Sequence, residues 1–340
     1  MLRKPLLIGV SAVVLVAAAC IGGLALYGWQ MLNSPMNIVG DSLRISVSPG
    51  RTLSRVGADL AADGVVANDQ LLRWYGRFSG DATQIKAGEY DVLAGTTPKQ
   101  LVDLLVAGNV VQYSFTIIEG WRFQDLMSAI RAHEQFVSTG LDDATVMAAL
   151  GEPDLHPEGQ FLPDTYHFPR DTKDIDVLKR AHAALLDTLA EAWRNRSTDV
   201  SVATDYEALV LASIIEKETA LTSERRQISG VFNRRLKQGI RLQADPTVIY
   251  GLGPDYDGNI RSADLQADTP YNTYTRRGLP PTPIALAGAD AIRAAVNPAL
   301  GDALYFVATG EADGSHYFSA SLEEHNAAVS RYLKTLRSKN

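Results

Sequence analysis

The sequence predicts an α+β protein in three parts: an N-terminal transmembrane helix, a small α/β module, and a larger domain of mixed helices and strands. Three observations support this prediction. An apolar run without charges stands near the N-terminus, strand-like segments followed by amphipathic helices come next, and the C-terminal part mixes helical periodicity with short strands and long polar loops. A chain of 340 residues is long enough for two or three domains.

The composition excludes several classes of protein. Hydrophobic residues make up 46% of the chain and charged residues 21%, as in ordinary globular proteins. A net charge of −7 argues against a nucleic-acid partner, because phosphate recognition needs a concentrated basic surface. Cys20 is the only cysteine, which rules out an intramolecular disulfide, and the six histidines lack the spacing of a zinc site. We therefore expect no metal and no cofactor.

The N-terminus predicts a membrane anchor. Arg3 and Lys4 precede the apolar, charge-free residues 5–27, about the ~20 residues that a helix needs to cross a ~30 Å hydrocarbon core. The basic residues should stay in the cytoplasm, which places the rest of the chain outside it. We accordingly expect a cytoplasmic tip at residues 1–4, the anchor at 5–27 and a tether at 28–41.

Two alternatives compete with an uncleaved anchor. The alanines at 17–19 are typical of the cleavage region of a signal peptide. Cys20 after Ala19 resembles a lipoprotein site, but Ala17 stands where a larger aliphatic residue is preferred. The apolar run continues as far as Trp29, longer than a usual signal core, and this favours the anchor.

A weak internal repeat follows the tether. Segments 45–50, 89–95 and 115–120 each read as a strand ending in glycine, and each is followed by apolar residues at helical spacing. Plain α/β packing is one interpretation, and a carbohydrate-binding module resembling LysM domains is the other. We place the LysM-like module at residues 42–110.

Residues 111–340 form the predicted larger domain. Its segment 121–204 is expected to be mainly helical, interrupted at 158–166 by a loop rich in glycine, proline, aspartate and aromatic residues, which either lines a cleft or forms a simple turn. The elements expected further on are helices near 205–220 and 222–238, a polar loop to about 284, a helix at 288–296, strands at 303–308 and 316–319, and a terminal helix.

The helix near 205–220 carries the first candidate for chemistry. Thr204 as N-cap and Glu207 at the third helical position fit a capping box. At 100° per residue, Glu218 projects into the middle of an apolar stripe and Glu216 projects from the opposite, polar side. The stripe consists of Val210, Leu211, Ile214 and Ile215.

A carboxylate on an apolar stripe is costly unless it is neutral, paired or beside a cleft. Burial would raise its pKa, as a general acid working near neutrality requires. The alternative is that the stripe ends before Glu218, which would then be an ordinary residue of the last helical turn.

The loops beyond this helix are rich in side chains that suit a sugar. Tyrosine rings stack on apolar sugar faces, and amides bind hydroxyl and acetamido groups. A surface loop stiffened by proline is the competing interpretation, and the pair His325–Asn326 could equally lie on a helix surface. The candidates in this region are Gln243, Asp245, Thr247, Tyr250, Tyr271, Asn272 and Asn326.

Several motifs in one order resemble the YceG-like family of endolytic murein transglycosylases. The resemblance covers nearly the whole chain and is densest from 206 to 330, and the catalytic helix shows no departure from the family pattern. The segments that carry it are IIEKETA at 214–220, SER at 223–225, RLQADPTVIYG at 241–251, YNTY at 271–274, GLPP at 278–281 and FLPDTY at 161–166.

The resemblance implies a lyase that cleaves the β-1,4 bond between N-acetylmuramic acid and N-acetylglucosamine in peptidoglycan. The matching glutamate is Glu218, expected to protonate the leaving oxygen and then to deprotonate the C6 hydroxyl of the muramoyl residue. The product would end in 1,6-anhydro-N-acetylmuramic acid, and no second catalytic carboxylate is needed. Substrate-binding residues would be Thr219, Gln243, Asp245, Tyr250, Tyr271, Asn272 and Asn326.

The resemblance also implies a place in the cell. We expect single-pass anchoring in the cell (inner) membrane with the catalytic domain periplasmic or extracytoplasmic. Expected partners are peptidoglycan strands, the membrane and penicillin-binding glycan synthases, with the cut terminating or trimming nascent strands. Two alternatives remain: a hydrolase in which Asp245 activates a water, and a non-catalytic scaffold that binds peptidoglycan and does not need Glu218.

Overall fold

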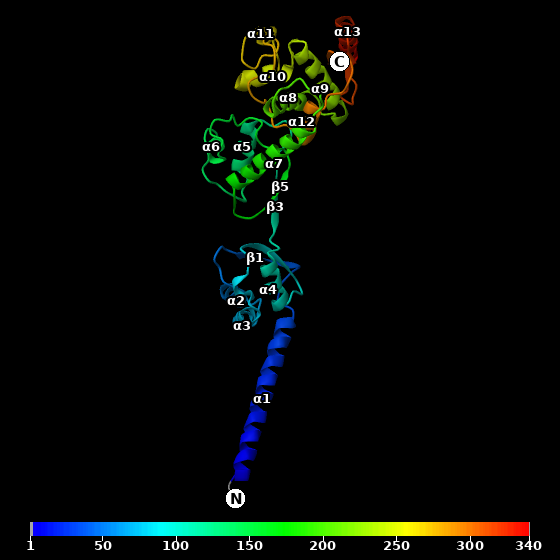
Figure 1. Ribbon diagram of the computed structural model, residues 1–340. Helices are drawn as coiled ribbons and strands as arrows, with labels where there is room; N and C mark the ends of the chain where they lie inside the picture. The colour runs from blue at the N-terminus through cyan, green and yellow to red at the C-terminus, as the bar shows by residue number, and fades with distance from the viewer. Residues whose placement is uncertain (1–2, 340) are drawn as a thin grey trace. The chain divides into compact units, whose positions relative to one another are not determined.

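The computed structural model describes residues 3–339, with side chains described for 13–337. Residues 1 and 2 of the predicted cytoplasmic tip lie outside that range. The chain divides into two compact units (Figure 1). The first runs to Tyr113 and includes Phe168–Asp171, and the second comprises Ser114–His167 and the chain from Thr172 onward. The fold is mixed α+β with an N-terminal apolar helix, and the predicted fold class is confirmed at that level.

The first unit begins with the long helix α1, Arg3–Asn33 (blue in Figure 1). Its segment Val13–Asn33 is the one helix among the described residues that is long and apolar enough to cross a membrane. Residues 28–33, placed in the tether by the sequence analysis, are the last turns of this helix. Gly28 and Met31 are half-buried there, and Met36 after the helix is buried in the core of the unit.

The rest of the first unit consists of two paired strands and three helices. The strands β1, Ser42–Val47, and β2, Gly88–Leu93, are antiparallel, with Ile45 opposite Tyr90. The side chain of Thr52 caps α2, Leu53–Ala62, and Thr97 with Gln100 forms a full capping box on α4, Pro98–Ala107. These strands and helices were predicted. The helix α3, Asp69–Ser79, and the 3-10 turn η1, Asp81–Thr83, were not.

Small residues let α3 pack closely. A Cβ on Gly76 would lie 2.3 Å from Cδ2 of Leu53, so α3 can approach α2 only because this position is a glycine. Leu72 and Gly76 form the buried face of α3, and its opposite face is exposed.

The second unit opens with short strands and helices. Strands β3 and β5 pair with each other, and both are divided between the two units; β4 and β6 pair in parallel. The segment 121–204 was predicted to be mainly helical, and helices make up most of its regular structure. Its short strands were not predicted, because strands of two to five residues are too short to show alternation in the sequence. The elements are β3 Gln112–Thr116, α5 Phe123–Ala132, β4 Phe136–Val137, α6 Val146–Ala149, β5 Thr165–Pro169, β6 Thr172–Lys173 and α7 Asp174–Arg194.

The central helix of the remaining part is α8, which packs against α7, α9, α10 and α12. Strands β7 and β8 form an antiparallel pair, with Tyr305 opposite Ser319. The loop predicted between 238 and 284 is partly helical. The elements are α8 Asp205–Glu218, α9 Thr222–Lys237, α10 Asp245–Leu252, η2 Gly253–Asp255, α11 Ser262–Gln266, α12 Ala289–Val296, β7 Tyr305–Ala308, β8 His316–Ser319 and α13 Leu322–Lys339.

Candidate active site

The helix α8 is the central element of the second unit. All eight residues from Ala208 to Ile215 are buried, so the helix has no polar face in this stretch and the predicted single stripe was wrong. The predicted capping box is half formed: Thr204 Oγ1 accepts a hydrogen bond from Glu207 N at 3.1 Å, but the Glu207 carboxylate accepts from Ala203 N rather than from the N-cap. Helices packed on several sides of α8 also bury the residues outside the predicted stripe.

Glu216 is a buried structural carboxylate. Its side chain is 5% exposed, and Arg225 Nη2 lies 2.8 Å from Glu216 Oε1. Gly288 N donates to the other carboxylate oxygen at 2.9 Å, and Arg225 also contacts Glu119 at 3.2 Å. Burial raises the pKa of Glu216, while these two donors counteract that rise. The prediction that Glu216 projects among polar positions was wrong, because its side chain is buried and paired with Arg225.

Glu218 has a different environment at the C-terminal end of the same helix. It is half-buried, and no group among the described side chains and backbone forms a hydrogen bond or ion pair with its carboxyl group. The pKa of Glu218 is raised to about 8: desolvation by burial is the largest cause, the nearby charge of Asp245 also raises it, and Arg235 lowers it. A carboxyl group with this pKa holds its proton at neutral pH and can donate it.

Asp245 lies at the start of α10 and is exposed. The hydroxyl of Tyr274 donates a hydrogen bond to Asp245 Oδ1, which fixes the carboxylate that acts on Glu218. Burial raises the pKa of Tyr274, so this hydroxyl remains a donor. Tyr274 lies in the segment YNTY at 271–274, and no role for it was predicted from the sequence.

Arg235, on α9, is a buried cation that the sequence analysis missed. Its guanidinium donates to the backbone oxygens of Leu304 at 2.6 Å and Leu242 at 2.7 Å, and lies 5.1 Å from the ring centroid of Tyr305. No carboxylate within the described range forms an ion pair with it, so its charge is available to stabilise an ionised Glu218. Nothing in the local sequence of α9 distinguishes Arg235 from surface arginines.

A pocket of about 370 Å³ adjoins α10 in the same unit. It contains Glu158, which is 4% exposed and accepts a hydrogen bond from Phe123 N at 3.0 Å. Burial raises the pKa of Glu158 to about 7, and the Phe123 amide, Tyr250 and Arg122 counteract that rise. Glu158 belongs to the loop 158–166, for which the sequence left two interpretations open, a cleft lining and a simple turn.

Two predicted residues line this pocket. The rings of Tyr250 and Tyr271 lie 4.8 Å apart, and the guanidinium of Arg122 lies 5.2 Å from the ring centroid of Tyr250. The Tyr271 hydroxyl is 2.9 Å from Thr282 Oγ1. The structure therefore brings both tyrosines together as an aromatic wall, with Tyr250 on α10, the helix that begins with Asp245.

The other predicted residues are placed less directly. Thr219 Oγ1 accepts from Leu221 N and shapes the end of α8. Gln243 is exposed and has a left-handed backbone, with φ of 53°. Thr247 is buried, and its hydroxyl donates to Ala244 O. Asn326 is exposed on α13.

Asn272 is buried, and its amide is used within its own loop. Its nitrogen donates to the backbone oxygens of Asp264, Leu265 and Ala267, and its oxygen accepts from Tyr274 N. Since both ends of the amide have partners, Asn272 shapes the loop that carries Tyr271 and Tyr274.

The comparisons with known proteins all point to one family. The sequence matches the YceG-like family over residues 45–331. It is 30% identical to the endolytic murein transglycosylase of Bacillus subtilis (strain 168), over 94% of this chain and 92% of that protein. It is 26% identical to the endolytic murein transglycosylase of Streptococcus pneumoniae serotype 2 (strain D39 / NCTC 7466), over 96% of this chain but only 65% of that protein's length. A crystal structure of a yceG-like protein from Listeria monocytogenes aligns with a TM-score of 0.53 and 29% identity, covering 85% of this chain and 99% of that one.

Proposed function

The chain belongs to the YceG-like family, and from this membership we propose that it is a murein lytic transglycosylase with Glu218 as its acid and base. The observation that carries the proposal is the carboxyl group of Glu218: half-buried, without a hydrogen-bond partner among the described residues, and with its pKa raised to about 8. Relatives that match nearly the whole chain carry the name endolytic murein transglycosylase.

In the first step, the protonated Glu218 gives its proton to the glycosidic oxygen between N-acetylmuramic acid and N-acetylglucosamine. The charge of Arg235 stabilises the carboxylate that remains. Asp245 has the opposite effect, because its charge favours the protonated form. Asp245 and Arg235 thus shift the pKa of Glu218 in opposite directions. The resulting pKa lets the carboxyl group donate a proton in the first step and accept one in the second.

In the second step, Glu218 takes the proton of the C6 hydroxyl on the muramoyl residue, and that oxygen attacks C1. The glycosidic bond is broken, the new C1–O6 bond closes a 1,6-anhydro ring, and Glu218 is protonated again without the use of water. The wall of Tyr250 and Tyr271 suits a sugar ring, because aromatic faces pack against the apolar faces of saccharides. Thr219, Gln243 and Asn326 remain proposed substrate contacts, whereas the buried amide of Asn272 supports a shaping role.

We propose residues 5–27 as a single-pass anchor in the cell membrane, 42–110 as a LysM-like glycan-binding module and 111–340 as the catalytic domain. The apolar α1 helix supports the anchor, and the strand–helix repeats support the module. An enzyme so anchored would cut nascent strands near the membrane and limit their length, beside the glycan synthases that make them.

Mass spectrometry of peptidoglycan digested by the purified chain tests the reaction. The fragments should be lighter by one water than hydrolysis products, and borohydride should not reduce the new ends. Reducible ends would make the enzyme a hydrolase, with Asp245 as the group that activates water. Binding of glycan without any cleavage, unchanged in Glu218→Gln, would identify a scaffold instead.

A further inference from the structure

The helix α3 leaves an aromatic face exposed. Trp74 is 53% exposed and Phe78 is 82% exposed, and their rings stack with centroids 5.8 Å apart. Leu71, one turn earlier, extends the same stripe, since residues three and seven positions apart share one face of a helix. The stripe lies opposite the buried Leu72 and Gly76, so packing in the core of the unit does not explain why the residues of the stripe are apolar.

Basic side chains border this aromatic stripe. Arg73 and Arg77 project about 60° to 100° to one side of Trp74, at 100° per residue. Arg73 is exposed and pairs with Asp69 at 3.1 Å, and Arg77 is exposed without an ion pair among the described residues. Aromatic and leucine side chains beside arginines are the composition of a helix that lies in the headgroup region of a bilayer.

The start of α3, which carries the stripe, packs against the last turns of α1. A Cβ on Gly28 of α1 would lie 3.7 Å from Cδ1 of Leu71, and α1 and α3 pack together within one compact unit. Gly28 belongs to the last turns of the span Val13–Asn33. If α1 crosses the membrane, these turns lie where hydrocarbon gives way to headgroups, and the start of α3 lies there too.

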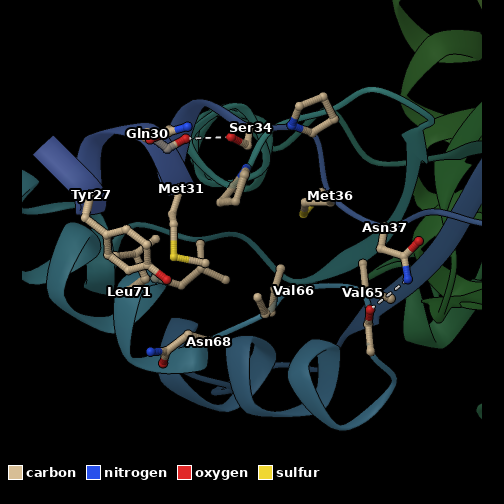
Figure 2. A pocket seen from close by; sticks show the side chains of 15 residues that line it. Tyr27, Gln30, Met31, Ser34, Met36, Asn37, Val65, Val66, Asn68 and Leu71 are labelled. Carbon is tan, nitrogen blue, oxygen red and sulfur yellow. Dashed lines mark hydrogen bonds between the residues drawn. The ribbon is translucent and has the colours of Figure 1, made fainter.

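A pocket lies between the end of α1 and the start of α3 with the residues before it. It has a volume of about 540 Å³, and its lining includes Tyr27 and Met31 of α1, Val66, and Leu71 of α3 (Figure 2). Asn68 and Gln30 stand at its edge with their amide groups. The walls are apolar and the edge is polar, as the boundary between an acyl chain and its headgroup requires.

We propose that this pocket and the aromatic stripe of α3 form a binding site for phospholipids of the outer leaflet. Trp74 and Phe78 insert between headgroups, an acyl chain fills the pocket beside Met31, and Arg77 binds a headgroup phosphate. The first unit then lies on the membrane surface instead of moving freely above it. This inference rests on the membrane anchor proposed above.

Spin labelling of the full chain in phosphatidylethanolamine/phosphatidylglycerol vesicles tests the site. In a Cys20→Ser background, single cysteines at 74 and 78 carry the label; position 24 reports the anchor, and the exposed Ser46 on β1 is the matched control from the same unit. Labels at 74 and 78 should be more accessible to oxygen than to a water-soluble nickel chelate, as at position 24, whereas position 46 shows the reverse. Circular dichroism checks that each labelled variant is folded.

The outcomes separate the two proposals. If position 24 is in lipid but 74 and 78 behave like 46, the lipid site is refuted and the anchor stands. If position 24 is accessible to nickel, the anchor is refuted, and the lipid site with it.

Discussion

Glu216 and Glu218 are two residues apart on α8, but their carboxyl groups have opposite surroundings. The Glu216 carboxylate is held by Arg225 and the Gly288 amide, while that of Glu218 has no partner among the described residues. A buried ion pair has a structural role. A desolvated acid without a partner lowers the stability of the folded protein but is suited to proton transfer. The difference lies in the partners each side chain meets, not in the polarity of the helix face.

This difference predicts two distinct defects. Glu218→Gln should leave the stability unchanged or raised and lower turnover by about 10²–10⁴-fold, the usual cost of removing an acid/base. Glu216→Gln should instead cost stability, toward the lower end of about 3–5 kcal/mol for a broken buried pair, because Arg225 keeps its contact with Glu119. Urea unfolding and release of anhydro-muropeptides measure the two effects. A stable, fully active Glu218→Gln protein would refute the assignment.

Asp245 predicts a shift in the pH dependence. Glu218 must be protonated to act as an acid, so kcat/KM should fall as the pH rises through its pKa of about 8. The charge of Asp245 raises that pKa, and Asp245→Asn should therefore move the alkaline limb of the profile to lower pH. Asp268→Asn is the matched control, because that exposed aspartate pairs with Arg276. A limb that stays in place, or moves to higher pH, would contradict the coupling.

At the scale of elements, the apolar spacing after segments 45–50 and 89–95 predicted the helices α2 and α4. The structure shows side-chain caps at the same places, Thr52 on α2 and Thr97 on α4, so the local signals agree there. The helix α3 was missed because Trp74 and Phe78 add apolar residues to its exposed face and blur the stripe.

The candidate site was predicted in part for similar reasons. Glu218 was found from its place on α8 and the motif around it, and Tyr250 and Tyr271 from the aromatic loops. Arg235 could not be found, because its partners lie on chain segments up to 69 residues away. The burial of α8 on all sides also depends on helices distant in sequence.

Gly159 lies where two loops of the second unit pack closely, against Pro283, and substituting it tests this contact. It has φ of 79°, and a Cβ there would lie 2.4 Å from Cβ of Pro283. Gly159→Ala should therefore destabilise the protein by more than the ~1 kcal/mol expected from a left-handed backbone alone. It should also lower activity, because the loop carries the adjacent Glu158 of the pocket.

Gly140→Ala is the control for this substitution. Gly140 has a similar φ of 71°, but a Cβ there would meet nothing within 4 Å. The difference in melting temperature between the two variants isolates the contact with Pro283 from backbone strain. Equal melting temperatures would mean that the two loops can separate without cost.

At the scale of the whole molecule, the apolar helix α1 is continuous with the folded chain. The last turns of α1 are half-buried against the first unit, and Met36 enters its core, so few residues are left to act as a free tether. If α1 is the proposed membrane anchor, its attachment to the first unit restricts where the enzyme can act. We expect its substrate strands to be those lying close to the membrane, where glycan is still being polymerised.

The orientation of the chain predicts a last outcome, which depends on Arg3 and Lys4. The segment that follows them has no charge as far as Tyr27, and basic residues flanking a span remain on the cytoplasmic side. Alkaline phosphatase fused after Asn340 should therefore be active, because it folds only outside the cytoplasm, and β-galactosidase at the same position should be inactive. Replacing both basic residues with glutamate should lower the phosphatase activity at equal protein level, whereas the double change to glutamine should lower it less. An active β-galactosidase fusion in the parent chain would place the Glu218 site in the cytoplasm, away from any peptidoglycan, and the proposed function would fail with the topology.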